Sequence, residues 1–350
     1  MTEVSPVERA IAALRSGRAV VIEGAAPIAV LPVETATPAM LELFDPRASA
    51  NLLISGARAA ALGLGNRLDA ADPERPVRIA RCDWLDPQAA RALVDAGRDM
   101  DRAPIGPLAT REIDGEAEAT AALTLARLAG LLPALWLIEP ADEIAARVDA
   151  RRLLDGTPQA TIVARANLPL DNLPPTQIIA FRASDDGEEH VALMVGAPGG
   201  QAPLVRLHSE CLTGDVFGSL KCDCGLQLKA ALGLIGEAGG GVLLYLRQEG
   251  RGIGLANKIR AYQLQDRGLD TVDANRRLGF ADDERDYAMA AAMLRALGVD
   301  SVRLLTNNPA KVAGLAAAGI SVIERVAHDM PVNPHNADYI AAKRAKSGHL

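Results

Sequence analysis

Three of the chain's four cysteines, Cys211, Cys222 and Cys224, fall within fourteen residues. Charged residues and glycines surround them rather than a continuous apolar run. Zn²⁺ favours thiolate ligands in four-coordinate geometry; a structural site normally has a fourth protein ligand, whereas a catalytic site keeps that place for water. The cluster therefore predicts a zinc site. Two alternatives stay open: three reduced core cysteines, or a structural zinc completed by His208.

The length of 350 residues predicts two domains. Hydrophobic residues make up 49% of the chain and aromatic residues only 3%, which indicates an alanine-rich α/β (α+β) fold. The formal net charge of −7 argues against a general nucleic-acid-binding protein. A small polyanionic substrate is compatible with it, because basic residues gather in the second half. They are Arg206, Lys221, Arg247, Arg251, Lys258, Arg260, Arg285 and Lys311.

The sequence begins without the basic and apolar regions of a secretory signal, and it contains no run of eighteen apolar residues. Four cysteines, three of them clustered, do not make a disulfide framework for a chain of this length. A cytoplasmic protein without membrane or nucleic-acid partners is the expectation. The isolated Cys82 is interpreted as a small core residue.

Helix and strand signals alternate along the chain. A first domain is predicted over 1–155 and a second over 163–350, with the boundary in 151–174. In the first domain we expect helices at 6–14 and 117–128 and a strand at 19–22. In the second we expect strands at 177–182 and 190–195 joined by a turn at 185–187, strands at 242–246, 302–305 and 321–325, and helices at 227–237, 255–266, 284–297 and 309–318. The polar tail after Ala327 is expected to be partly disordered.

Glycines at 249–254 follow an expected strand and precede an expected helix. Such a loop lets backbone N–H groups approach an anion, although a plain strand-to-helix turn explains glycines equally well. Arg247 and Arg251 flank the loop and favour a di- or triphosphate ligand. The acidic run at 282–286 and the turn at 306–309 are further candidates. Their alternative explanations are a helix-dipole complement and a proline-started helix.

Together these stretches resemble the GTP cyclohydrolase II family over more than half of the chain. The matching motifs are RLHSECLTGD at 206–215, KCDCG at 221–225, RQEGRGIGL at 247–255 and LGF at 278–280. The resemblance implies a Zn²⁺ enzyme that also needs Mg²⁺, acts as a homodimer, and takes the first step of riboflavin synthesis. It would convert GTP to formate, pyrophosphate and 2,5-diamino-6-(5-phosphoribosylamino)pyrimidin-4(3H)-one.

Carried over position by position, the resemblance makes Cys211, Cys222 and Cys224 the zinc ligands. It gives the proton-acceptor role to Asp283 and an imidazole-opening role to Tyr262. It also implies Arg285 as a nucleophile, but a protonated guanidinium is poorly nucleophilic, so a charge clamp on the α-phosphate is the rival interpretation. The implied GTP site comprises Arg206, Leu207, His208, Ser209, Glu210, Gln227, Glu249, Gly250, Arg251, Thr271, Thr306 and Lys311.

The first domain resembles 3,4-dihydroxy-2-butanone-4-phosphate synthase at 7–22 and 125–131. That family has an acidic metal-binding loop after its first strand, whereas 24–30 holds no carboxylate here. Glu118 stands at the position of the family's histidine, and Thr120 at that of its glutamate. Without acidic ligands and the histidine, we expect this domain to be inactive.

Two other functions stay open. One is a paralogue that acts on a related nucleotide or stops at a formylated intermediate, although Tyr262 speaks against the latter. The other is a non-enzymatic guanine-nucleotide-binding regulator, which would not need a metal set and acid–base residues together.

Overall fold

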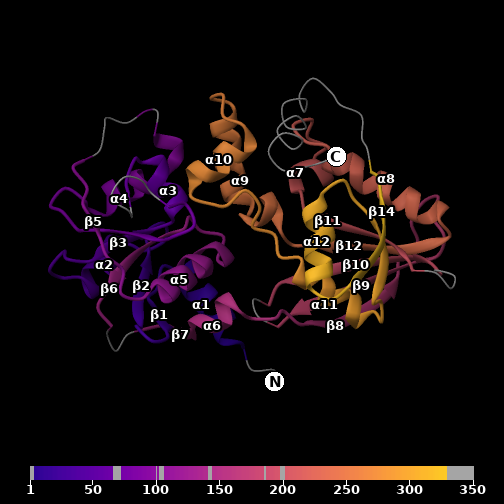
Figure 1. The fold of residues 1–350 in the computed structure, drawn as a ribbon, viewed down its shortest axis with the longest axis horizontal. Helices are drawn as coiled ribbons and strands as arrows, with labels where there is room; N and C mark the ends of the chain where they lie inside the picture. The colour runs from indigo at the N-terminus through magenta and orange to yellow at the C-terminus, as the bar shows by residue number, and fades with distance from the viewer. Residues whose placement is uncertain are drawn as a thin grey trace. The chain divides into compact units, whose positions relative to one another are not determined.

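The computed structural model describes residues 4–65, 72–99, 101, 106–140, 144–184, 187–197 and 202–328. The chain divides into two compact units, each described by itself (Figure 1). Unit 1 comprises Met1–Gly156 and Ile253–Glu284, and unit 2 comprises Thr157–Gly252 and Arg285–Leu350. Among the described residues, no helix combines the length and apolar character that a membrane crossing requires.

Unit 1 is built on a seven-stranded sheet in the order β5-β4-β3-β6-β2-β1-β7. Its neighbouring strands run antiparallel except for the parallel pair β1 and β7. The strands are β1 (Val20–Glu23), β2 (Ile28–Pro32), β3 (Asn51–Ile54), β4 (Val77–Ile79), β5 (Thr110–Arg111), β6 (Ala134–Ile138) and β7 (Ala146–Asp149). The helices are α1 (Pro6–Arg15), α2 (Pro38–Phe44), α3 (Gly56–Ala61), α4 (Pro87–Val94), η1 (Ala96–Arg98), α5 (Glu116–Leu128), α6 (Ala150–Leu154), α9 (Leu255–Gln265) and α10 (Thr271–Leu278).

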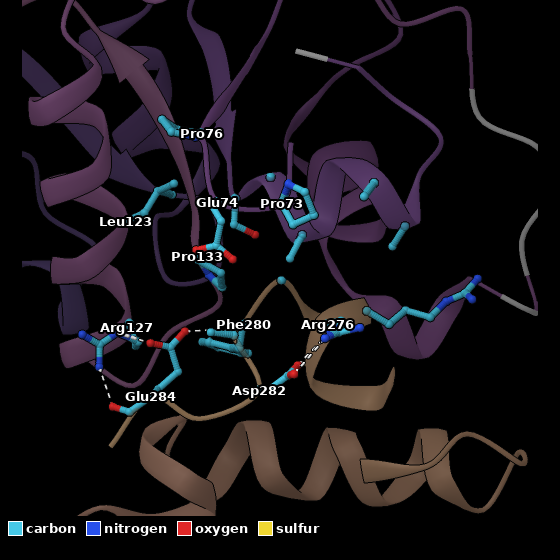
Figure 2. Close-up of a pocket in the computed structure, with 18 of the residues that line it drawn as sticks. Pro73, Glu74, Pro76, Leu123, Arg127, Pro133, Arg276, Phe280, Asp282 and Glu284 are labelled. Carbon is cyan, nitrogen blue, oxygen red and sulfur yellow. Dashed lines mark hydrogen bonds and ion pairs between the residues drawn. The ribbon is translucent and has the colours of Figure 1, made fainter. Parts of the chain in front are cut away.

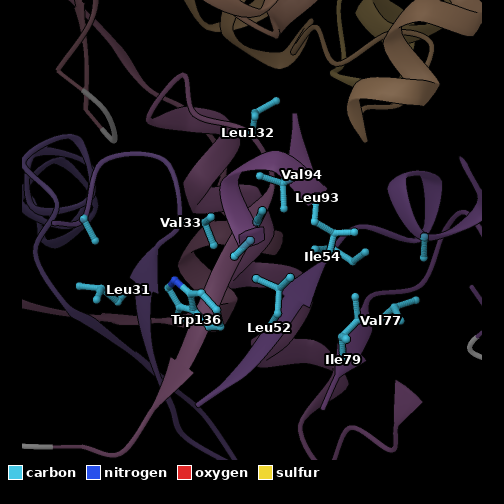
Figure 3. Packing of buried hydrophobic residues seen from close by; sticks show 14 of the residues in the cluster. Leu31, Val33, Leu52, Ile54, Val77, Ile79, Leu93, Val94, Leu132 and Trp136 are labelled. Atoms are coloured by element: carbon cyan, nitrogen blue, oxygen red, sulfur yellow. The ribbon is translucent and has the colours of Figure 1, made fainter. Parts of the chain in front are cut away.

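Both faces of this sheet are apolar. Because side chains alternate along a strand, Leu52 and Ile54 of β3 enter one core cluster while Leu53 enters the other. Trp136 and Leu52 lie together in the first cluster (Figure 3). At the start of α1, Ser5 accepts a hydrogen bond from the Glu8 amide at 3.0 Å, which is the N-cap that the sequence predicts.

The segment Ile253–Glu284 packs with the N-terminal part of the chain. Its side chains Ile253, Ala261, Leu264, Ala274, Leu278 and Phe280 join the first core cluster of unit 1. We expected this segment inside a continuous second domain over 163–350. Its helices α9 and α10 each carry an apolar stripe, and the cluster around β3 and α4 covers those stripes.

Unit 2 is built on a seven-stranded sheet in the order β14-β13-β11-β12-β10-β9-β8. Four neighbouring strands, β14, β13, β11 and β12, run parallel, and the remaining three continue antiparallel. The strands are β8 (Ala160–Asn167), β9 (Thr176–Ala183), β10 (Glu189–Gly196), β11 (Leu204–Ser209), β12 (Gly240–Leu246), β13 (Ser301–Leu305) and β14 (Ser321–Val326). The helices are α7 (Leu212–Asp215), α8 (Cys224–Glu237), η2 (Glu249–Gly252), α11 (Ala288–Ala296) and α12 (Pro309–Ala317).

The expected α/β class is confirmed, with three local corrections. The helix expected at 284–297 begins only at Ala288, because the acidic residues before it bond to side chains and to a local backbone N–H instead of forming a helical turn. Strand β8 occupies the predicted boundary 151–174, and α10 was not predicted. The turn residues Asp185 and Asp186, and the tail from residue 329 onward, lie outside the described residues.

Candidate active site

The carboxyl ends of the parallel strands in unit 2 gather the cysteine and glycine motifs of the sequence at one edge of the sheet. Strand β11 ends at Ser209 before Cys211, β12 ends at Leu246 before the glycine loop, and β13 ends at Leu305 before Thr306. Parallel strands place these ends side by side, which is where open α/β sheets bind ligands. The register pairs Ser209 with Leu246 directly.

The three clustered cysteines converge in space. Their Sγ atoms all lie within 4.8 Å of one another, and those of Cys211 and Cys222 are 3.7 Å apart. Cys211 precedes α7 and Cys224 begins α8, so two helix starts and the loop between them position the sulfurs. Among the described residues, this group of potential ligands contains the three thiols and nothing else.

The thiol surroundings fit a cation. Hydrogen bonding to Cys211 is the largest cause that raises the pKa of Cys222 and, more strongly, that of Cys224. Three thiolates this close repel one another, so a positive ion is what would hold them deprotonated together. The Gly214 amide donates to the Cys211 sulfur at 3.4 Å. A Cβ added at Gly214 would stand 2.9 Å from the Cys222 sulfur, so only glycine leaves the sulfurs their room.

Asp215 contacts His208 and so keeps it from acting as a metal ligand. Its Nε2 lies 3.0 Å from both Asp215 carboxylate oxygens. The same carboxylate accepts hydrogen bonds from the Cys211 amide at 3.0 Å and from the Tyr245 hydroxyl at 2.9 Å. Burial lowers the pKa of His208 despite this partner. His208 therefore supports the cysteine loop through Asp215, and the alternative in which it completes a structural zinc has no support among the described contacts.

Arg206 extends from β11 toward α8. Its guanidinium donates to the Leu305 carbonyl at 3.0 Å and to the Gln227 side-chain oxygen at 2.5 Å. Gln227 in turn donates to Asp223 at 2.6 Å. Burial is the main cause that lowers the pKa of Arg206 to about 10. The guanidinium is still charged at neutral pH, so it places a buried positive charge beside the cysteine loop.

Several buried polar atoms around this edge have no hydrogen-bond partner in the part of the chain that the structure describes. They are Arg206 Nε, His208 Nδ1, Ser209 Oγ and His328 Nδ1. Three of them belong to a single strand, β11. Buried polar groups are normally hydrogen-bonded, so such a concentration indicates a bound polar ligand or ordered water.

The glycine loop is tied to the cysteine loop by a buried carboxylate. Glu249 accepts hydrogen bonds from the Leu212 amide at 2.7 Å and from the Gly250 amide at 2.9 Å. Gly250 and Arg251 then adopt left-handed backbone conformations, with φ of 64° and 62°. That conformation is costly for arginine, and strained residues of this kind cluster at ligand-binding sites.

The turn after β13 adds two more of the expected residues. Thr306 is buried, and its hydroxyl oxygen accepts a hydrogen bond from the Asn308 amide at 3.0 Å. Lys311 is also buried and donates to the Leu207 carbonyl at 2.6 Å. Glu210 forms an ion pair with Arg247 at 2.9 Å, and burial is the main cause that raises its pKa.

The predicted site residues are divided between the two units. Unit 2 brings together the three cysteines with Arg206, His208, Gln227, Glu249, Thr306 and Lys311, and Arg285 also belongs to it. Tyr262, Thr271 and Asp283 belong to unit 1. There Tyr262 lies on α9 with Lys258 Nζ 5.7 Å from its ring centroid, and Thr271 begins α10.

Sequence reasoning missed four residues that shape the site. Asp215 anchors His208, Tyr245 and the Cys211 amide, and Asp223 orients Gln227. Tyr245 stacks on His208 with ring centroids 5.4 Å apart. His328 contacts the Gln227 carbonyl through Nε2 at 3.0 Å. Asp215 and Asp223 stand inside the recognised motifs and could have been singled out, whereas nothing in the sequence around His328 marks it.

In unit 1, Glu118 fills the place where the resemblance would put a histidine. Its carboxylate is 4% exposed and accepts a hydrogen bond from the Ala26 amide at 3.1 Å. A Cβ added at Gly24 would come within 2.1 Å of the same carboxylate. The loop after β1 is therefore closed over the Glu118 side chain.

Residues 161–327 match the family model described as GTP cyclohydrolase II. A relative named GTP cyclohydrolase-2 from Azospirillum brasilense is 44% identical over 367 residues, covering 98% of this chain and 93% of its own. One of the same name from Enterobacter sp. (strain 638) is 57% identical over 192 residues, which is 54% of this chain and 96% of its own. A two-domain 3,4-dihydroxy-2-butanone 4-phosphate synthase structure from A. baumannii covers 93% of this chain at 18% identity and a TM-score of 0.32, a likeness too low to support a shared fold. The relative from A. brasilense matches along nearly the whole chain, and the family motifs coincide with the cysteine edge of unit 2: the chain belongs to the GTP cyclohydrolase II family.

Proposed function

We propose that the protein hydrolyses GTP to formate, pyrophosphate and the diaminopyrimidinone product, the first step of riboflavin biosynthesis. One observation carries the proposal. Three convergent thiols lie beside a strand whose buried polar atoms Arg206 Nε, His208 Nδ1 and Ser209 Oγ have no partner among the residues that the structure describes. A metal-activated water and a polar, charged substrate suit those two features.

We assign Zn²⁺ to Cys211, Cys222 and Cys224, because three thiolates and an open fourth position are typical of a catalytic zinc. When bound, zinc lowers the pKa of its water toward about 7 and so supplies hydroxide at neutral pH. Gly214 leaves the sulfurs room, and Asp215 fixes the backbone amide of Cys211. These contacts keep the three thiols converged.

We assign the GTP site to the edge of β11 and its neighbouring loops. Arg206, His208, Ser209, Glu210, Gln227, Glu249, Gly250, Arg251, Thr306 and Lys311 would line it, together with the backbone of Leu207 and with Thr271. The left-handed loop at Gly250 and Arg251 presents backbone and guanidinium groups that suit a triphosphate with its Mg²⁺.

Three residues would handle the reacting groups. Asp283 would accept a proton, Tyr262 would move protons during opening of the imidazole ring, and Arg285 would act on the α-phosphate. For Arg285 a charge clamp is chemically easier than a covalent nucleophile, because a guanidinium stays protonated at neutral pH. Rapid-quench trapping with α-labelled GTP separates the two roles: a guanylyl-protein species would support the nucleophile, and its absence the clamp.

We further propose that the chain works as a cytoplasmic homodimer with a GTP cyclohydrolase II domain over 163–350. The domain over 1–155 would be a degenerate relative of dihydroxybutanone-phosphate synthase that has lost its activity. The buried Glu118 contact with Ala26 supports that loss, because a carboxylate now fills the loop after β1. Incubation with ribulose 5-phosphate should yield no butanone phosphate; any such product would contradict the assignment.

Activity and metal content of Cys222→Ser test the proposal. Wild-type protein with GTP, Zn²⁺ and Mg²⁺ should release formate and pyrophosphate, and the variant should bind less zinc and release neither. Full turnover by the variant would refute the zinc assignment. A formylated product would indicate the paralogue, and GTP binding without turnover would indicate a nucleotide-binding regulator.

A further inference from the structure

The irregular segment between α10 and α11 carries Asp283 and leads directly into Arg285. Apart from Gly279 and Phe280, its residues are at least partly exposed. We propose that Arg127, from the N-terminal part of the chain, is a positioning residue that holds this segment for GTP turnover. The inference rests on the proposed role of Asp283, and it gives the catalytically degenerate N-terminal part a task in the reaction.

Arg127 bonds both the carboxylate and the backbone carbonyl of Glu284. The guanidinium Nε lies 3.1 Å from a Glu284 carboxylate oxygen, and Nη1 donates to the Glu284 carbonyl at 3.2 Å (Figure 2). The second carboxylate oxygen accepts a hydrogen bond from the Ala281 amide at 2.8 Å. Arg127 on α5 thus holds Glu284, and the Glu284 carboxylate in turn closes the four-residue turn that contains Asp283.

None of the four residues of that turn is buried. A cavity of about 980 Å³ opens beside it, lined by α3, α5 and the segment itself. Phe280, 1% exposed, anchors the start of the segment, and Arg276 pairs with Asp282 at 2.7 Å on the surface. The Arg127 and Glu284 side chains are 22% and 20% exposed, so their pair is better shielded from solvent than the Arg276 pair, at 60% and 35%. We therefore expect the Arg127 pair to restrain the turn more strongly than the Arg276 pair does.

Other N-terminal residues hold the helices that precede this turn. Arg58 is buried and donates to Asp99 at 2.7 Å and to the Arg277 carbonyl at 2.9 Å. Arg277 in turn bonds the same Asp99 at 3.1 Å. On α9, Arg260 pairs with Glu34 at 2.6 Å. These contacts fix the middle of α9 and the C-terminal end of α10, and Arg127 holds the turn that follows.

Loss of the contacts between Arg127 and Glu284 should reduce turnover more than substrate affinity. Small misplacements of a reacting group can lower rates on the order of a hundredfold, whereas the contacts that we assign to binding GTP belong mostly to unit 2. We expect Arg127→Ala in the full chain to lower kcat by roughly tenfold to a hundredfold with little change in KM. Arg127→Lys should recover part of the loss, because lysine keeps the charge but cannot bond the Glu284 carboxylate and carbonyl in the same way.

Hydrogen exchange provides a second readout that does not depend on turnover. In Arg127→Ala, amides at 281–287 should exchange faster while those of β3 and β6 stay protected. Glu284→Gln breaks the same ion pair from the other side with little change in size, and it should show the same local effect. Arg75→Ala is the matched control: Arg75 lines the same cavity but bonds Glu116 at 2.7 Å, away from the turn. It should leave both exchange at 281–287 and kcat unchanged.

Unchanged exchange at 281–287 in both pair variants would overturn the inference, as would faster exchange with wild-type kcat. Equal losses in Arg75→Ala would also overturn it, since the effect would then be general. Should wild-type protein fail to turn over GTP, the proposed function fails, and the exchange experiment still decides whether Arg127 holds the turn.

Discussion

Gly214 is the position where one added methyl group tests the metal site most sharply. In Gly214→Ala, the new Cβ would stand 2.9 Å from the Cys222 sulfur, 3.1 Å from the Cys211 sulfur and 3.1 Å from the Cys224 Cβ. Ordinary contact begins near 3.4 Å, so the sulfurs must separate by several tenths of an ångström. Protein metal sites tolerate distance changes of about 0.2 Å.

The expected loss of zinc affinity follows from that displacement of the sulfurs. Overpacking at a filled site costs about 1–3 kcal/mol, and here the strain falls on the thiols themselves. We expect zinc affinity to fall roughly tenfold to a hundredfold, which corresponds to about 1.4–2.7 kcal/mol. Competition with a chelator, read with the metal content of the purified protein, measures this loss.

Gly233→Ala is the matched control. Gly233 lies inside α8, the helix that Cys224 begins, and an added Cβ there would meet nothing within 4 Å. Alanine in a helix interior is favoured over glycine by roughly 0.5–1 kcal/mol, so this variant should be slightly more stable and bind zinc normally. Wild-type zinc affinity in Gly214→Ala would refute the reasoning that the three sulfurs close on one ion.

Three further variants test other residues of unit 2. Asp215→Asn should destabilise the protein by roughly 2–4 kcal/mol in chemical unfolding, because one buried carboxylate serves His208, Tyr245 and the Cys211 amide; a loss below about 0.5 kcal/mol would contradict that role. Burial lowers the pKa of His190 to about 4, so the folded state favours the neutral ring. The contribution of the neutral ring to stability is complete above about pH 6.5 and is lost as the pH falls toward 4. His190→Gln should therefore remove about 2 kcal/mol of the difference in unfolding free energy between pH 7.5 and pH 5. An equally steep pH dependence in that variant would exclude His190 as the cause. Arg251→Gly should raise the KM for GTP while leaving stability equal or up to about 1 kcal/mol higher, because glycine relieves the left-handed backbone; a large drop in stability would show that Arg251 has a structural role instead.

The sequence predicts those helices and strands whose patterns are local. The apolar stretches that become β12 and β13 and the capped start of α1 are visible from neighbouring residues alone. Strand β8 was missed because it carries mostly exposed residues at the sheet edge. The helix expected from residue 284 begins later because Glu284 bonds Arg127, a partner far away in the chain.

The residues of the site also divide into those that local motifs predict and those that only the tertiary fold brings together. The three cysteines and the glycine loop follow from motifs, since the residue types themselves carry the chemistry. The packing of Ile253–Glu284 with the N-terminal part does not follow from them, because its contacts join residues far apart in the chain, such as Arg260 and Glu34. His328 reaches Gln227 only through the tertiary fold. Contacts across long stretches of sequence leave no local pattern to detect.

Product analysis with the whole 350-residue chain tests directly whether the protein opens the purine ring of GTP. The zinc-loaded protein is mixed with GTP and Mg²⁺, and formate, pyrophosphate and the purine-derived product are quantified together by mass spectrometry. We expect equal amounts of formate and pyrophosphate and a product whose imidazole ring has opened and lost its formyl carbon. Intact guanine rings, or a product that keeps the formyl group, would contradict it.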